Sequence, residues 1–155
     1  PEHKFLQKVK DIAHANGALV IFDEVITGFR FGIGGAQAYF GVTPDLSTFG
    51  KAIANGLPLS ALVGKREYMK VFDFNQVFYS STFGDEPVAL SAALATLQEI
   101  IRKPVAKHIW RLGKKLQNGY NALAKTYHLP TALIGSPAEL AVEIGWPLED
   151  DQLLM

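Results

Sequence analysis

The sequence predicts a globular α/β fold, with helices packed on a sheet. Apolar residues recur at helical spacing over residues 2–16, and Gly17 suits the left-handed position that ends a helix. Residues 18–22 form a continuous apolar run, which is typical of a strand buried on both faces of a parallel sheet. A helix, a short glycine loop and a buried strand in this order indicate an α/β layer.

Composition limits the class of protein. The 155 residues fit about one domain, and 48% hydrophobic with 19% charged residues is a globular balance. Fifteen basic and fifteen acidic residues give zero net charge, which argues against a general nucleic-acid or acidic-membrane surface. The absence of cysteine excludes disulfides, thiolate metal sites and a cysteine nucleophile, and is compatible with a cytoplasmic protein. No apolar run reaches the roughly 18 residues that span a bilayer.

Glycine is concentrated between residues 28 and 64, which hold eight of the 14 glycines. Glycine permits positive φ and close backbone approach. We therefore expect a shaped site here, with short strands near residues 46–49 and 60–63. A linker would contain more serine, proline and charge.

Two further helices are expected in the second half of the chain. Residues 87–101 begin with Pro87, which fits a first helical turn, and their apolarity on all sides predicts burial between other elements. Residues 104–127 carry an apolar stripe with the basic residues outside it, so the basic run at 102–115 is a helix face and not a nucleic-acid site. Residues 140–144 indicate another strand.

Asp23 and Glu24 directly follow the first expected strand. Ligands of open α/β sheets bind beyond the carboxyl ends of the strands, and a carboxylate there usually meets a cation. Local sequence leaves three interpretations open. The pair could hold a metal as a Walker B strand does, pair with the protonated ring nitrogen of a cofactor, or cap the next turn.

Lys51 follows Gly50 at the end of the next expected strand. A P-loop requires Gly-x-x-x-x-Gly-Lys-Ser/Thr, but Asp45 stands at its first glycine and Ala52 at its hydroxyl position, so this is not a P-loop. A solvated surface lysine is the ordinary interpretation. The alternative is a lysine among glycines and apolar side chains, where desolvation favours the neutral amine that forms Schiff bases.

Hydroxyl groups precede the helix that begins at Pro87. Ser80, Ser81 and Thr82 could hold a phosphate at the helix entrance, or they could cap the helix. The four histidines show no metal-ligand spacing, so we expect surface or packing histidines and no metal site; they are His3, His14, His108 and His128.

A longer ordered pattern connects these groups. It reads Leu-Val-Ile-Phe-Asp-Glu-Val-Ile-Thr-Gly-Phe-Arg at 19–30, Gly-Gly-Ala-Gln at 34–37, Phe-Gly-Val-Thr-Pro-Asp-Leu at 40–46, Gly-Lys at 50–51 and Gly-Leu-Pro at 56–58. This pattern resembles the class-III, pyridoxal-phosphate-dependent aminotransferases, and within them the glutamate-1-semialdehyde 2,1-aminomutase branch. The resemblance covers about residues 1–127 and is loose after His128.

The resemblance implies a fold-type-I enzyme with pyridoxal 5′-phosphate as cofactor. Lys51 would form the internal aldimine and move the substrate proton. Asp23 would pair with the pyridinium nitrogen, and Val25 would pack against the ring. Thr82 would bind the cofactor phosphate, assisted by the Ser81 backbone. In this family that threonine usually reaches the neighbouring subunit's site, which implies a homodimer.

Two positions depart from the family pattern. Ile26 stands where many members carry glutamine, and Asp85-Glu86 stand where the family often has a single asparagine before the proline. Arg30 is a minor candidate for a substrate carboxylate. The implied reaction is amino-group transfer between an amine or amino acid and a carbonyl compound, or intramolecular transfer in a mutase. The sequence does not choose between them.

The resemblance also implies a division of the chain. Residues 1–103 would form the second half of the large cofactor-binding domain, and residues 104–155 the linking helix and the start of the small C-terminal domain. Because the chain begins at Pro1 and ends in an apolar run, we expect a piece of a longer protein. Two alternatives stand beside the enzyme: an NTPase fragment with residues 19–24 as its Walker B strand, and a non-catalytic fragment or degenerate homologue.

Overall fold

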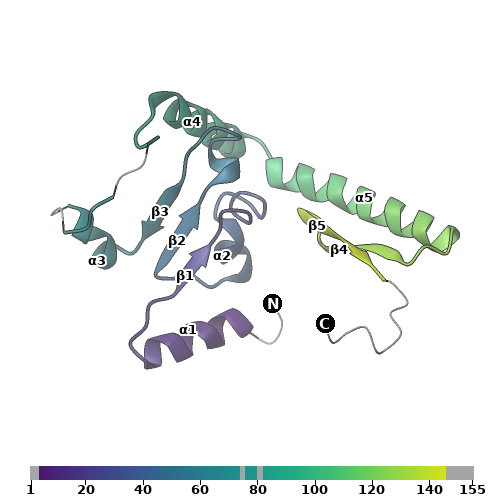
Figure 1. Cartoon of the computed structure of the whole chain (residues 1–155), viewed down its shortest axis with the longest axis horizontal. Helices are drawn as coiled ribbons and strands as arrows, with labels where there is room; N and C mark the ends of the chain where they lie inside the picture. The colour runs from purple at the N-terminus through teal and green to yellow at the C-terminus, as the bar shows by residue number, and fades with distance from the viewer. Residues whose placement is uncertain (1–3, 74–75, 80–81, 146–155) are drawn as a thin grey trace. The chain divides into compact units, whose positions relative to one another are not determined.

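The computed structural model describes residues 4–73, 76–79 and 82–145, and these form a mixed α/β structure (Figure 1). The chain divides into two compact units, Pro1–Ala106 and Lys107–Met155. The first unit contains a three-stranded sheet with helices, and the second contains a long helix and a two-stranded sheet. The predicted α/β class is confirmed.

The sheet of the first unit has the order β1–β2–β3. Strands β1 (Ile21–Asp23) and β2 (Leu46–Phe49) are parallel, whereas β3 (Ala61–Gly64) runs antiparallel to β2. The expected strands are therefore present, but the sheet is mixed. The expected burial of the first strand on both faces is wrong, since Ile21 is 57% exposed. The continuous apolar run correctly indicated a strand, but such a run does not show whether other elements cover both faces of that strand.

Helices precede, separate and follow the strands of this sheet in the order of the chain. Helix α1 (Phe5–Ala15) precedes β1 and ends before Gly17, as expected. Helix α2 (Gly35–Phe40) was not predicted, because six residues within a glycine-rich region carry too little periodicity. Three short elements and one longer helix complete the unit; they are the 3-10 turn η1 (Lys51–Ile53), α3 (Arg66–Met69), the 3-10 turn η2 (Lys70–Phe72) and α4 (Pro87–Arg102).

The core of the first unit lies where η1 meets α4. Phe49, Ile53, Ala54 and Ala93 are buried together, and the ring of Phe29 packs on that of Phe49 with centroids 5.6 Å apart. Only Ala89 and Ala93 of α4 are fully buried, and several of its larger apolar side chains are exposed, among them Leu94 at 60%. The expected burial of α4 on all sides is therefore wrong for this chain. No helix among the described residues is both long and apolar enough to cross a membrane.

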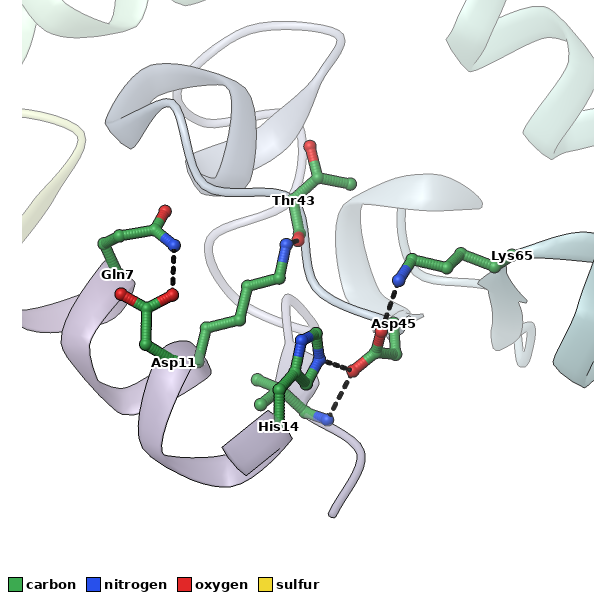
Figure 2. A network of polar contacts seen from close by, with 8 residues as sticks. Gln7, Asp11, His14, Thr43, Asp45 and Lys65 are labelled. Carbon is green, nitrogen blue, oxygen red and sulfur yellow. Dashed lines mark hydrogen bonds and ion pairs between the residues drawn. The ribbon is translucent and has the colours of Figure 1, made fainter. Parts of the chain in front are cut away.

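A buried carboxylate joins the separate parts of the first unit (Figure 2). Asp45 is 0% exposed. Its Oδ1 accepts from Lys65 Nζ at 2.6 Å, and its Oδ2 accepts from Val20 N at 2.8 Å and lies 2.8 Å from His14 Nε2. Asp45 also donates its backbone N–H to Val20 O. Asp45 therefore connects α1, the segment before β1, the start of β2 and the end of β3.

The second unit is built from one helix and one hairpin. Helix α5 (Val105–Thr126) confirms the helix expected over residues 104–127. Strands β4 (Thr131–Ser136) and β5 (Glu139–Ile144) are antiparallel and joined by a two-residue turn. The sequence indicated β5 but not β4.

Polar and small residues of α5 contact the hairpin, and they include Tyr120 of the apolar stripe, whose hydroxyl lies 2.8 Å from Thr131 Oγ1. Asn121 accepts from Leu133 N at 2.7 Å and donates to Leu133 O at 3.1 Å, and Gln117 also donates to Leu133 O. A Cβ at Gly113 would overlap the backbone of Pro137, so this position needs glycine. Leu116 of the apolar stripe is 60% exposed.

We expect the Asp45 carboxylate to make stability dependent on pH at the acid end. The Lys65 ammonium, the Val20 N–H and the His14 ring hold the pKa of Asp45 well below its usual value of 3.8. At pH values between the lowered folded pKa and 3.8, unfolding of the protein takes up a proton on Asp45. The contribution of Asp45 to the free energy of unfolding is therefore fully present above about pH 5 and is lost as the pH falls toward the folded pKa. The free energy of unfolding should fall by at most about 1.4 kcal/mol per pH unit from this group.

Urea titrations of the wild type and Asp45→Asn between pH 7 and 2.5 would measure this slope. Asp45→Asn should be less stable at neutral pH and should lack this part of the slope. Asp11→Asn is the matched control, because Asp11 is an exposed carboxylate on α1 bonded to Gln7. Equal slopes for the wild type and Asp45→Asn would contradict the assignment.

Candidate functional site

The carboxyl ends of β1 and β2 lie side by side, and they bring the sequence candidates to one edge of the sheet. The two strands are parallel, with Asp23 opposite Thr48. Asp23 Oδ1 accepts from Val25 N at 2.9 Å and from Thr48 Oγ1 at 3.3 Å. The exposed Asp23 carboxylate is therefore held in place by its own turn and by the neighbouring strand.

Lys51 follows β2 directly and opens the turn η1. Its φ is +43°, a left-handed conformation that costs a residue with a side chain of order 1–3 kcal/mol. Ile53 and Ala54, which follow it, are anchored in the core. Lys51 itself is exposed, so the apolar surroundings expected from its sequence neighbours are not present in the described residues. Its neighbours in sequence turn toward the core and leave the lysine at the surface.

Val25 and Gly50 join the two strand ends into one site. A Cβ at Gly50 would lie 3.3 Å from Val25 Cγ1, which is tighter than an ordinary contact. Glycine therefore allows the segment after β1 to approach the segment after β2. Asp23 and Val25 come to one edge with Gly50 and Lys51, and Gly50 was not identified from the sequence as part of the site.

Glu24 differs from its neighbour in burial and in partners. It is 2% exposed, and its carboxylate accepts from Thr27 Oγ1 at 2.9 Å, Ala36 N at 2.7 Å and Gln37 N at 2.8 Å. The last two are orphan N–H groups in the first turn of α2. Of the three interpretations of the acidic pair, capping applies to Glu24. The described residues contain no group of three or more His, Cys, Asp or Glu side chains that could hold a metal ion.

Thr82 lies in an exposed turn before α4, and Ser81 lies outside the described residues. Glu86, not a serine or threonine, caps α4, accepting from Val88 N at 3.0 Å and Ala89 N at 2.6 Å. Pro87 occupies the first turn as expected. The Thr82 hydroxyl is therefore not needed as the cap of this helix.

Comparison with known proteins identifies the family. The chain matches the aminotransferase class-III family over residues 1–150. It belongs to the class-III aminotransferases. Nothing in the comparisons supports the NTPase alternative.

Relatives with two kinds of activity resemble this class-III aminotransferase chain. It is 47% identical over 121 residues to a glutamate-1-semialdehyde 2,1-aminomutase of Alkaliphilus oremlandii, covering 77% of this chain and 28% of the relative. It is 41% identical over 137 residues to a 3-aminobutyryl-CoA aminotransferase of Cloacimonas acidaminovorans, covering 88% of this chain and 33% of the relative. The chain thus spans about a third of the length of the curated relatives it matches.

A solved structure shares the fold. The PLP internal aldimine form of the FumI protein of Sphingopyxis sp. MTA144 is 28% identical, with a TM-score of 0.81 over 90% of this chain and 33% of that one. The fold is that of the fold-type-I, pyridoxal-phosphate-dependent transaminases, as the sequence predicted.

Gly35 tests the packing around the Glu24 carboxylate. Gly35 and Gly41 both have φ +69°, but a Cβ at Gly35 would lie 2.6 Å from Glu24 Oε2, whereas a Cβ at Gly41 would meet nothing within 4 Å. Gly41→Ala should therefore cost about 1–3 kcal/mol from backbone strain alone. Gly35→Ala should cost about 1–3 kcal/mol more, because it displaces the buried carboxylate from its donors. Chemical denaturation of both variants measures the difference, and equal losses would contradict it.

Proposed function

We propose that this chain is part of a pyridoxal-phosphate-dependent enzyme that transfers an amino group between an amine or amino acid and a carbonyl compound. The observation that carries the proposal is the placement of Asp23 at the end of β1 and of Lys51 just after β2, two parallel neighbouring strands, in a class-III aminotransferase. Intramolecular transfer, as in the aminomutase relatives, is the same chemistry with one substrate.

The residues at this edge fit the proposed cofactor chemically. A carboxylate suits a protonated ring nitrogen, an apolar side chain suits a ring face, and a primary amine suits an aldehyde. Asp23, Val25 and Lys51 supply these three groups, and Gly50 leaves the space a Cβ would occupy beside Val25. When bound, pyridoxal phosphate supplies an electron sink for the carbon next to the transferred nitrogen.

Asp23 would hold the proton on the ring nitrogen. Its carboxylate is oriented by Val25 N and Thr48 Oγ1, so it needs little reorganisation to accept a further donor. Val25 and Gly50 would exclude water from one side of the same ring, which strengthens the charge-assisted hydrogen bond to Asp23.

Lys51 would attach the cofactor through Nζ and, once released by the substrate amine, would carry the proton between the substrate carbon and the cofactor as a general acid and base. The left-handed backbone at Lys51 supports this role, since strained conformations concentrate at functional sites. The buried Ile53 and Ala54 hold this turn against the core.

The remaining roles belong to the rest of the site. Thr82, assisted by Ser81, would bind the cofactor phosphate of a second copy of the chain, which makes the protein a homodimer. The exposure of Thr82 supports a role outside its own unit.

We further propose a cytoplasmic enzyme, with residues 1–103 in the large domain and 104–155 in the linking helix and small domain. A degenerate, non-catalytic homologue is the competing proposal, and the retained Lys51 argues against it.

Lys51→Ala should abolish covalent attachment of pyridoxal phosphate. Borohydride reduction after incubation with the cofactor, followed by peptide mapping, should label Lys51 in the wild type, and turnover should fall by about 10³-fold or more in the variant. Lys70→Ala, at another exposed lysine, is the control and should keep the label. The experiment uses the longest form of the protein that the gene encodes. Labels scattered over surface lysines in the wild type would overturn the proposed function.

Asp23→Asn should still bind pyridoxal phosphate but lose most of its turnover. An asparagine cannot hold the ring nitrogen protonated, so we expect a loss of about 10²-fold or more with a cofactor affinity close to that of the wild type. Single-turnover absorbance changes would measure it, using whichever of L-alanine, L-glutamate and β-alanine the wild type converts fastest. Asp11→Asn is the control. A wild-type rate in Asp23→Asn would leave Asp23 with only a structural role.

A further inference from the structure

Glu24 stands between Asp23 and Val25 in the chain, but it is buried where Asp23 is exposed. We infer that Glu24 is a positioning residue: its buried carboxylate fixes the turn that carries Asp23 and Val25 toward the cofactor ring. This inference rests on the proposed function of those two neighbours.

Backbone and side chain of Glu24 are engaged together. Its N–H donates to Thr48 O at 2.9 Å, which continues the ladder between β1 and β2. Its carbonyl accepts from Gly28 N at 2.8 Å, which closes the turn after the strand. A Cβ at Gly28 would press on Glu24 O and on the Phe49 ring, so the turn is seated directly on the core. The position of residue 24 is therefore determined from both sides of the strand end.

The carboxylate adds a third attachment, to α2. Both of its oxygens accept, from one hydroxyl and two helix N–H groups, and an ionised carboxyl group has only acceptors to offer. A glutamine would keep the shape but would turn an NH₂ group toward the N–H of Ala36 or Gln37. One donor would then face another in a buried site, and the turn would move to relieve the conflict.

Movement of this turn reaches the proposed site directly. The hydrogen bond from Val25 N to Asp23 Oδ1 lies within it, and Val25 contacts the space beside Gly50. A misplacement of about 1 Å can cost about 100-fold in a catalytic arrangement, so a carboxylate that never touches the cofactor can control how Asp23 meets it.

The test compares Glu24→Gln with Gly41→Ala, which strains the other end of α2 without contacting Glu24. Two measurements are made on the full-length protein: hydrogen exchange of the peptide 21–30 without cofactor, and the affinity for pyridoxal phosphate with the pH midpoint of its visible absorbance. Glu24→Gln should exchange faster in this peptide and shift the midpoint in the direction of Asp23→Asn. It should also bind the cofactor about 10-fold more weakly, because the same movement displaces Val25 from the ring face. Gly41→Ala should do none of these while losing stability.

A double variant separates positioning from general destabilisation. If Glu24 acts through Asp23, Glu24→Gln should shift the midpoint little further when Asp23 is already asparagine. Full additivity of the two shifts, or wild-type values in a folded Glu24→Gln protein, would overturn the inference and leave the proposed function standing. A wild type that takes up no pyridoxal phosphate overturns both.

Thr27→Val is the second variant should Glu24→Gln not fold. Valine preserves the shape of threonine and removes one of the three donors to the carboxylate. Thr27→Val should then show faster exchange of the peptide 21–30 and a cofactor affinity about two- to three-fold below that of the wild type. Wild-type exchange and affinity in Thr27→Val would contradict the positioning role.

Discussion

The Asp45 carboxylate accepts from groups 20, 25 and 31 residues away along the chain, and the first unit depends on it. A buried carboxylate without donors would be costly, so Val20, Lys65 and His14 must all be brought to it. The contact with Val20 also aligns the entry to β1 with the entry to β2. Because strands paired from a fixed start keep their register to the end, the same carboxylate determines that Asp23 lies opposite Thr48.

Three aspartate or glutamate side chains near the sheet perform different tasks because their surroundings differ. Asp45 is enclosed and surrounded by donors from several elements, so it joins the unit together. Glu24 is enclosed by a hydroxyl and a helix start, so it holds a local turn. Asp23 is exposed at the strand end, and its two donors in the described part of the chain, Val25 N and Thr48 Oγ1, both contact one carboxylate oxygen, Oδ1. It is therefore the one of the three side chains that is available to a ligand. Burial and donor supply, not residue type, separate these roles.

The sequence was sufficient for the class of fold, for the strands near residues 21, 46 and 61, and for the helices that begin near Phe5, Pro87 and Val105. It could not give α2, whose start depends on the side chain of Glu24 from twelve residues earlier. The sequence overestimated the burial of Ile21 and Leu94. An apolar side chain favours burial, but its sequence position does not show which other element will cover it. Gly50 could have been recognised by placing it beside Val25, but that requires the parallel pairing to be known.

The amide of Asn121 pairs with both backbone groups of Leu133, as the peptide of an adjacent strand would. Position 133 on the outer edge of β4 is therefore already saturated by a side chain from α5. A strand from another molecule cannot extend the hairpin sheet through that position without first displacing the amide. Helix α5 therefore blocks edge-to-edge pairing at this position through hydrogen bonds to the backbone of residue 133, while the Leu133 side chain is buried, with 7% exposed.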